Sequence, residues 1–135
     1  MNATLAVNWG KWLADYFSSQ RKTNPFLLAA KFGWRVVMEN EGNDGALLPA
    51  RFAEWDGGER RIRLFIPILR RHRGNSNRVL YRACAHELFH GLVAVNYRGL
   101  GLSPKSIPSL NYREEEIAAQ VFSEALFNSQ LEEES

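Results

Sequence analysis

The segment from about residue 75 to residue 97 constrains this chain most, because it reads as a helix that is apolar around much of its circumference. A helix of that kind packs on more than one side, so we expect it at the centre of the domain. Its apolar positions are Val79, Leu80, Ala83, Cys84, Leu88, Leu92 and Val95. The same helix carries His86, Glu87 and His90, and polar groups buried without partners cost several kcal/mol. These three residues therefore need a specific reason to be there.

The composition is that of an ordinary globular protein. The 135 residues, 45% of them hydrophobic, suffice for one domain with a core, which we expect to span residues 1–135. A formal net charge of +2 does not indicate nucleic-acid binding by itself. The single cysteine excludes an internal disulfide, and we expect no secretion signal and no membrane span. These features predict a cytoplasmic protein.

Two helices are predicted before a region of strands. Apolar residues at helical spacing predict a helix over residues 5–17. Asn24 as a cap, Pro25 in the first turn and Gly33 as a stop predict a second helix. The expected strands are 34–39, 46–55 and 60–68. The turn sequence DGG at 56–58 joins the last two strands in a hairpin.

The helical period returns from 75 to 97, and after a loop a second long helix is predicted over 111–131. Asn111 suits its cap, with Glu114 as the reciprocal partner. The fold class that follows is α+β, with two N-terminal helices, a small antiparallel sheet and two C-terminal helices that carry the candidate site.

The spacing of the polar residues suits a metal-dependent hydrolase. Histidines four positions apart on a helix share one face, so His86 and His90 can converge on one ion. Glu87 is rotated off that line, where it can reach water bound to the ion. Zinc lowers the pKa of such water to about 7, and a neighbouring carboxylate takes the proton. This pattern predicts a zinc site with Glu87 as the general base.

A simpler interpretation is that His86 and His90 are ordinary polar residues at a helix edge. The acid between them and the apolar surroundings favour the metal site. A catalytic zinc ion usually takes three protein ligands, and no histidine follows His90. We therefore expect a carboxylate from the last helix, where the candidates are Glu114, Glu115, Glu116 and Glu124. Helical periodicity alone leaves Glu115 and Glu116 both open.

The stretches AHELFHG and EEEIAAQVFSEALF resemble the ImmA/IrrE-type metallopeptidase family, whose members show H-E-[LIF]-G-H and later E-x-x-A-x-x-F-A. Glu116, Ala119 and Phe122 match the second motif. The resemblance covers residues 24–127 and implies a minimal zincin-like metallopeptidase domain. The zinc ligands that it implies are His86, His90 and Glu116, with Glu87 as the catalytic residue. Phe89 departs from the family's glycine, so we expect wider spacing or a partly filled cleft there.

Peptide hydrolysis also needs a donor for the developing oxyanion. Tyr97 lies two turns after His90 and is our candidate, with Tyr112 and His72 as less favoured alternatives. Four arginines between residues 69 and 78 suit an anionic partner, but a solvated loop is the simpler interpretation. That segment has no interleaved aromatic residues on which bases could stack.

These observations predict a zinc-dependent endopeptidase, and the resemblance implies a specific regulatory protein as its substrate. The alternative is a non-catalytic zinc-containing module, a pseudo-peptidase, that binds a regulatory protein partner. A nucleic-acid-binding domain built on the arginine-rich segment is a third and less favoured reading.

Overall fold

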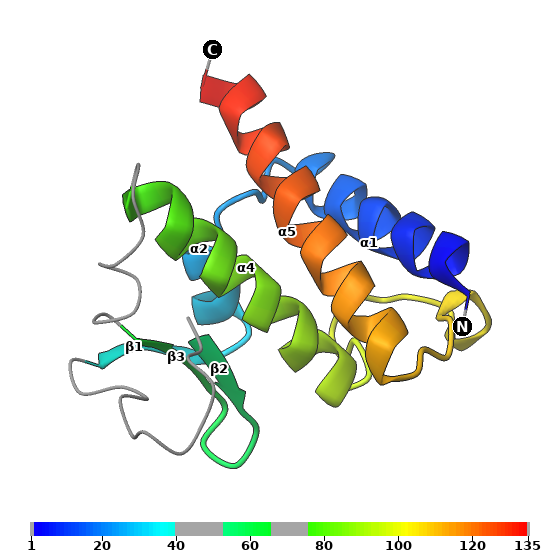
Figure 1. Cartoon of the computed structure of the whole chain (residues 1–135), viewed down its shortest axis with the longest axis horizontal. Helices are drawn as coiled ribbons and strands as arrows, with labels where there is room; N and C mark the ends of the chain where they lie inside the picture. The colour runs from blue at the N-terminus through cyan, green and yellow to red at the C-terminus, as the bar shows by residue number, and fades with distance from the viewer. Residues whose placement is uncertain (1, 40–52, 66–75, 135) are drawn as a thin grey trace.

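The structure is a computed structural model that describes residues 2–39, 53–65 and 76–134. In chain order its elements are α1 (Ala3–Ser18), α2 (Pro25–Lys31), β1 (Arg35–Glu39), β2 (Ala53–Asp56), β3 (Arg61–Phe65), α4 (Ser76–Ala94), the short 3₁₀ helix η1 (Pro104–Ser106) and α5 (Tyr112–Glu134) (Figure 1). The α+β class is therefore confirmed. Predicted strand residues 46–52 and 66–68, and residues 69–75 of the arginine-rich segment, lie outside the described residues.

Asparagine side chains cap both N-terminal helices, and Asn24 is the cap that the sequence predicts for the second. The Asn2 side chain accepts a hydrogen bond from the Leu5 N–H at 2.9 Å and caps α1. Asn24 caps α2 by accepting from the Phe26 N–H at 2.9 Å, and Gly33 follows that helix with φ +81°. The residues that α1 buries are Ala6, Trp9, Gly10, Leu13, Ala14 and Phe17.

The sheet is mixed, so the prediction of an antiparallel sheet is wrong for one of its two pairings. β2 and β3 form the predicted antiparallel hairpin, with Trp55 opposite Ile62. β1 runs parallel to β3 on its other edge, with Val36 opposite Ile62. The strand order is β1-β3-β2, so the strands do not pair in chain order. β3 takes the centre because Ile62 and Leu64 are completely buried there.

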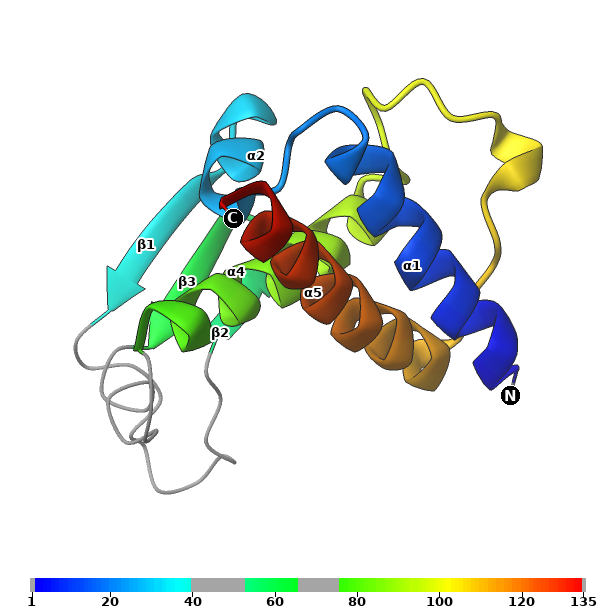
Figure 2. The same cartoon turned by 90° about the horizontal axis from the view of Figure 1, so that it is seen from above.

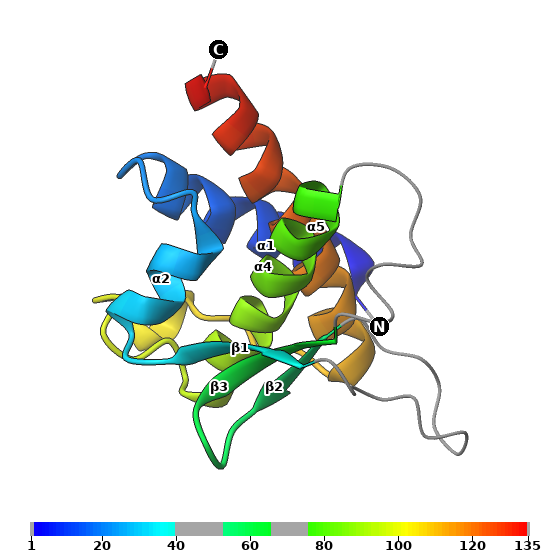
Figure 3. The same cartoon turned by 90° about the vertical axis from the view of Figure 1, so that its left-hand side faces the viewer.

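α4 is the central helix that its apolar composition predicts. It packs on β2 and β3 on one side and on α5 on another, while α1 covers α5 (Figures 2 and 3). Leu88 and Leu92 are completely buried in this position. Cys84 is buried too, as predicted for a small core residue, and burial raises the pKa of its thiol to about 12.

The predicted capping box begins α5. The Asn111 side chain accepts from the Glu114 N–H, and the Glu114 carboxylate accepts from the Asn111 N–H, both at 2.9 Å. The second Glu114 carboxylate oxygen accepts from the Asn2 N–H at 2.6 Å. Glu114 is buried, and it therefore joins the beginning of α1 to the beginning of α5.

α1 and α5 approach each other closely at Gly10. A Cβ atom added there would lie 2.5 Å from the Ala118 carbonyl oxygen and 3.1 Å from Val121 Cβ. The first distance is shorter than any ordinary contact, and its partner is backbone that cannot rotate away. The absence of a side chain at Gly10 is what allows the two helices to pack at this spacing.

Gly10→Ala is expected to lower the free energy of unfolding by about 1–3 kcal/mol, because overpacking outweighs the helix propensity of alanine. Urea denaturation measures the difference. Gly58→Ala is the control, since a Cβ there meets nothing closer than Asp56 Oδ1 at 3.6 Å. A Gly10→Ala variant as stable as the wild type would contradict the close packing of α1 on α5.

Glu114→Gln is expected to reduce stability in a pH-dependent way. Hydrogen bonds from the Asn111 and Asn2 N–H groups lower the pKa of Glu114 in the folded protein. Its contribution is therefore complete above the ordinary carboxyl pKa and is lost as pH falls through the lowered value. Urea denaturation should show a gap between variant and wild type that is widest at neutral pH and narrows in acid. A gap independent of pH would rule out this linkage.

Candidate metal centre

α4 presents both motif histidines on one face. The ring centroids of His86 and His90 lie 4.9 Å apart, as expected for residues one helical turn apart. Both side chains are largely buried. Burial lowers the pKa of His86, and the nearby His90 lowers it further. The neutral ring that a metal ion requires is therefore favoured at this position.

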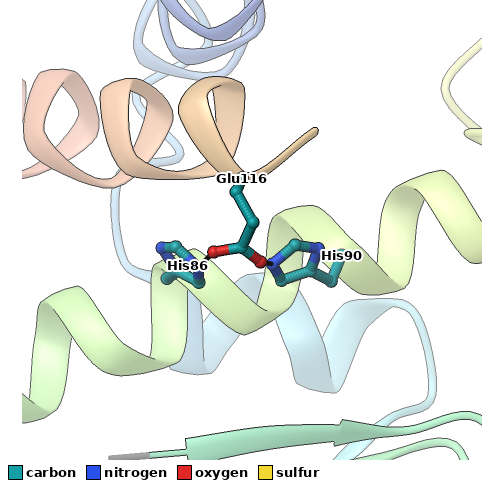
Figure 4. Close-up of side chains that lie close together, drawn as sticks. All are labelled: His86, His90 and Glu116. Carbon is teal, nitrogen blue, oxygen red and sulfur yellow. Dashed lines mark ion pairs between the residues drawn. The ribbon is translucent and has the colours of Figure 1, made fainter. Parts of the chain in front are cut away.

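α5 brings Glu116 to these histidines (Figure 4). One Glu116 carboxylate oxygen lies 3.3 Å from His86 Nε2, and the other lies 2.7 Å from His90 Nε2. Ligand atoms of the three residues all lie within 4.8 Å of one another. Tetrahedral ligands about 2.0–2.2 Å from one zinc ion lie about 3.3–3.6 Å apart, so side-chain shifts of about 1 Å would complete the set.

Glu115 also reaches His90, but at the opposite ring nitrogen. Its carboxylate lies 2.5 Å from Nδ1. A neutral imidazole carries one N–H, yet both nitrogens of His90 face a carboxylate oxygen. A metal ion at Nε2 would bind Glu116 there and leave the single N–H for Glu115, so the donor set fits a His-His-Glu zinc site.

Glu87 is positioned by the sheet. Its carboxylate accepts a hydrogen bond from the Trp55 N–H of β2 at 2.9 Å. Burial raises the pKa of Glu87, while the charge of His90 and the Trp55 N–H act in the opposite direction. The side chain lines the same cavity as the three candidate ligands. Glu87 is thus a half-buried carboxylate with a fixed orientation beside the candidate metal position.

The site opens into a cavity of about 630 Å³ between α4, α5 and β2. Its lining residues are Ala53, Glu54, Trp55, Val79, Arg82, Ala83, His86, Glu87, His90, Tyr112, Glu116, Gln120 and Ser123. Tyr112 and Ser123 lie three helical turns apart on α5, which is about 16 Å. An extended peptide of about five residues covers that length.

Tyr97, the predicted oxyanion donor, is not among the described residues that line this cavity. It is buried, and its hydroxyl accepts a hydrogen bond from Trp9 Nε1 at 2.9 Å. The prediction extended the helix two turns beyond His90, but α4 ends at Ala94 and Tyr97 has φ +56°. The turn directs its ring toward α1. Tyr112, the alternative candidate, does line the cavity and is 78% exposed.

Phe89 does not fill the cleft, so one of the two alternatives expected from the motif, a partly filled cleft, is wrong. Its side chain is completely buried, and its ring packs against Phe122 of α5 with centroids 5.6 Å apart. One residue along a helix is a rotation of about 100°, which takes Phe89 off the face that carries His90. The ring that departs from the family motif therefore belongs to the core.

Glu87 is positioned by Trp55, and Gly91 allows Trp55 to pack against α4. Trp55 donates the backbone hydrogen bond, and its ring packs on Trp34 with centroids 4.6 Å apart. Gly91 makes room for this pair, since an added Cβ would lie 2.9 Å from the Trp34 ring and 3.1 Å from the Trp55 ring. A glycine inside the helical pattern, directly after His90, was the only sequence signal of this packing.

Comparison with protein-family models, with curated proteins and with solved structures found no match. The zincin-like fold and the ImmA/IrrE resemblance thus stay predictions from the sequence motifs. Within the described ranges, every helix is too short or too polar to cross a membrane.

We expect the purified chain to bind one zinc ion through His86, His90 and Glu116. Loss of an outer-shell partner typically weakens metal binding by about 10–100-fold. Replacing any one of these three ligands by alanine should weaken zinc binding by more than that. Competition with a chromogenic chelator measures the affinity, and Glu124→Ala on the exposed face of α5 is the control. A wild-type chain that binds no zinc, or ligand variants with wild-type affinity, would exclude this site.

Proposed function

We propose that this protein is a zinc-dependent endopeptidase that acts on a specific regulatory protein. The observation that carries the proposal is the position of Glu87, whose carboxylate is held by the Trp55 N–H beside the His86, His90 and Glu116 cluster. A zinc site with a purely structural role needs ligands but no additional carboxylate in the adjoining cavity.

The residues have separable roles in such a reaction. When bound, zinc polarises the scissile carbonyl and activates water. His86, His90 and Glu116 would hold the ion, which leaves a position open for substrate. Glu87 Oε1 accepts the Trp55 N–H, so Oε2 is available to take the proton of the attacking water and pass it to the leaving amine.

The shape of the cavity supports a peptide substrate. Its lining residues on α5 extend from Tyr112 to Ser123, about 16 Å in all with Glu116 between them, which suits an extended chain better than a small metabolite. β2 contributes Ala53, Glu54 and Trp55 to the lining opposite α5. The resemblance to ImmA/IrrE-type metallopeptidases points the same way and suggests a regulatory protein as the substrate.

A zinc-loaded wild-type chain is expected to cleave members of a proteome-derived peptide library, with new termini identified by mass spectrometry. Glu87→Gln should retain zinc and lose about 10²–10⁴-fold in rate, because it removes the general base. Glu59→Gln makes the same charge change on an exposed turn and should leave the rate unchanged.

Cleavage that persists at the wild-type rate in Glu87→Gln would contradict the proposed mechanism. Bound zinc without cleavage of any library member, or of intact proteins, would favour the alternative of a non-catalytic zinc module that binds a protein partner. Measuring zinc content on the same samples separates that result from simple loss of the metal.

A further inference from the structure

His90 is contacted at both ring nitrogens by consecutive residues of α5. Glu115 Oε2 lies 2.5 Å from Nδ1, and Glu116 Oε1 lies 2.7 Å from Nε2. His86, by contrast, has a carboxylate contact at Nε2 alone among the described residues. The two glutamates therefore do not duplicate each other, because they lie on opposite sides of one ring.

Only one of these sides can face a metal ion. The Nε2 atoms of both histidines converge on Glu116, which lines the cavity and whose side chain is 42% exposed. Glu115 is not among the cavity-lining residues, and its side chain is 23% exposed. The two nitrogens of a ring point in divergent directions, so the carboxylate at Nδ1 does not reach an ion bound at Nε2.

The contact at Nδ1 determines which form of the ring is available to a metal. An ion needs the lone pair of Nε2, so the ring proton must be on Nδ1. A carboxylate at 2.5 Å accepts that proton in a charge-assisted hydrogen bond, which favours the required tautomer and prevents the ring from rotating. Ring orientation matters here because α4 supplies His90 while the third donor comes from another helix.

We propose that Glu115 is a positioning residue of the metal centre: it accepts the Nδ1–H of His90 and holds the ring with Nε2 directed at the ion. The inference rests on the metal site of the proposed function and is independent of peptide cleavage. It assigns different roles to the two glutamates that helical periodicity could not separate. Glu116 is a metal ligand, and Glu115 holds the ligand His90 in place.

Zinc affinity measured by chelator competition tests this role. Glu115→Gln, which is isosteric, and Glu115→Ala are expected to weaken binding by about 10–100-fold, and Glu115→Asp should recover part of the loss. Glu124→Ala, an exposed substitution on the same helix, should have no effect. Urea denaturation of the metal-free variants, run in parallel, confirms that the compared proteins are folded.

The ring itself provides a second readout. The chain has three histidines, so the ¹⁵N signals of each imidazole can be assigned by single substitutions. In the zinc-loaded wild type, His90 should carry its proton on Nδ1 and bind metal through Nε2. In Glu115→Gln this signal should broaden or shift, because the ring is no longer held in one orientation. A merely structural role for Glu115 would alter stability without changing this signal.

Wild-type zinc affinity together with an unchanged His90 signal in the Glu115 variants would overturn the inference, whether or not the protein cleaves peptides. Weakened zinc binding in those variants supports it, even if the wild type proves inactive and the peptidase proposal fails. A wild-type chain that binds no zinc would overturn both.

Discussion

The candidate site depends on how α5 crosses α4 at His90. Consecutive glutamates of α5 lie on either side of that one imidazole, Glu115 at Nδ1 and Glu116 at Nε2. Side chains of consecutive helical residues diverge by about 100°, so both can reach one ring only where the two helices are in direct contact. α1 packs against α5 and supports this contact. Gly10 lets the α1 backbone approach Ala118 of α5, and the Glu114 carboxylate accepts a hydrogen bond from the Asn2 N–H.

The sheet supports the other half of the site. The Trp55 N–H of β2 orients Glu87, and the Trp34–Trp55 pair lies directly against Gly91 of α4. The candidate base and the candidate ligands are therefore positioned by different neighbours of the same central helix. Such a site is preorganised by packing, and a shift of either neighbour would misplace one group while leaving the other.

Features that depend on local sequence were predicted correctly. Asn24 and the Asn111–Glu114 pair act within one turn of chain, and the β2–β3 hairpin closes over the four residues 57–60. Several features that depend on packing between distant segments were not predicted correctly. In the order β1-β3-β2, the most buried strand lies in the middle of the sheet. Phe89 belongs to the core because its ring packs against Phe122, which is far away in sequence. The prediction that Tyr97 faces the site was wrong because α4 ends at Ala94, earlier than the apolar pattern suggested.

The sequence by itself determined that His86 and His90 share a helical face with Glu87 beside them, because the 3.6-residue period of an α-helix sets those positions. It also predicted that a further donor would come from the last helix. Only the tertiary structure decided that Glu116 meets both Nε2 atoms, that Glu115 takes Nδ1 of His90, and that Trp55 orients Glu87. The crossing of α4 and α5 and the docking of β2 arise from side-chain packing between distant segments, and spacing along the chain does not encode them.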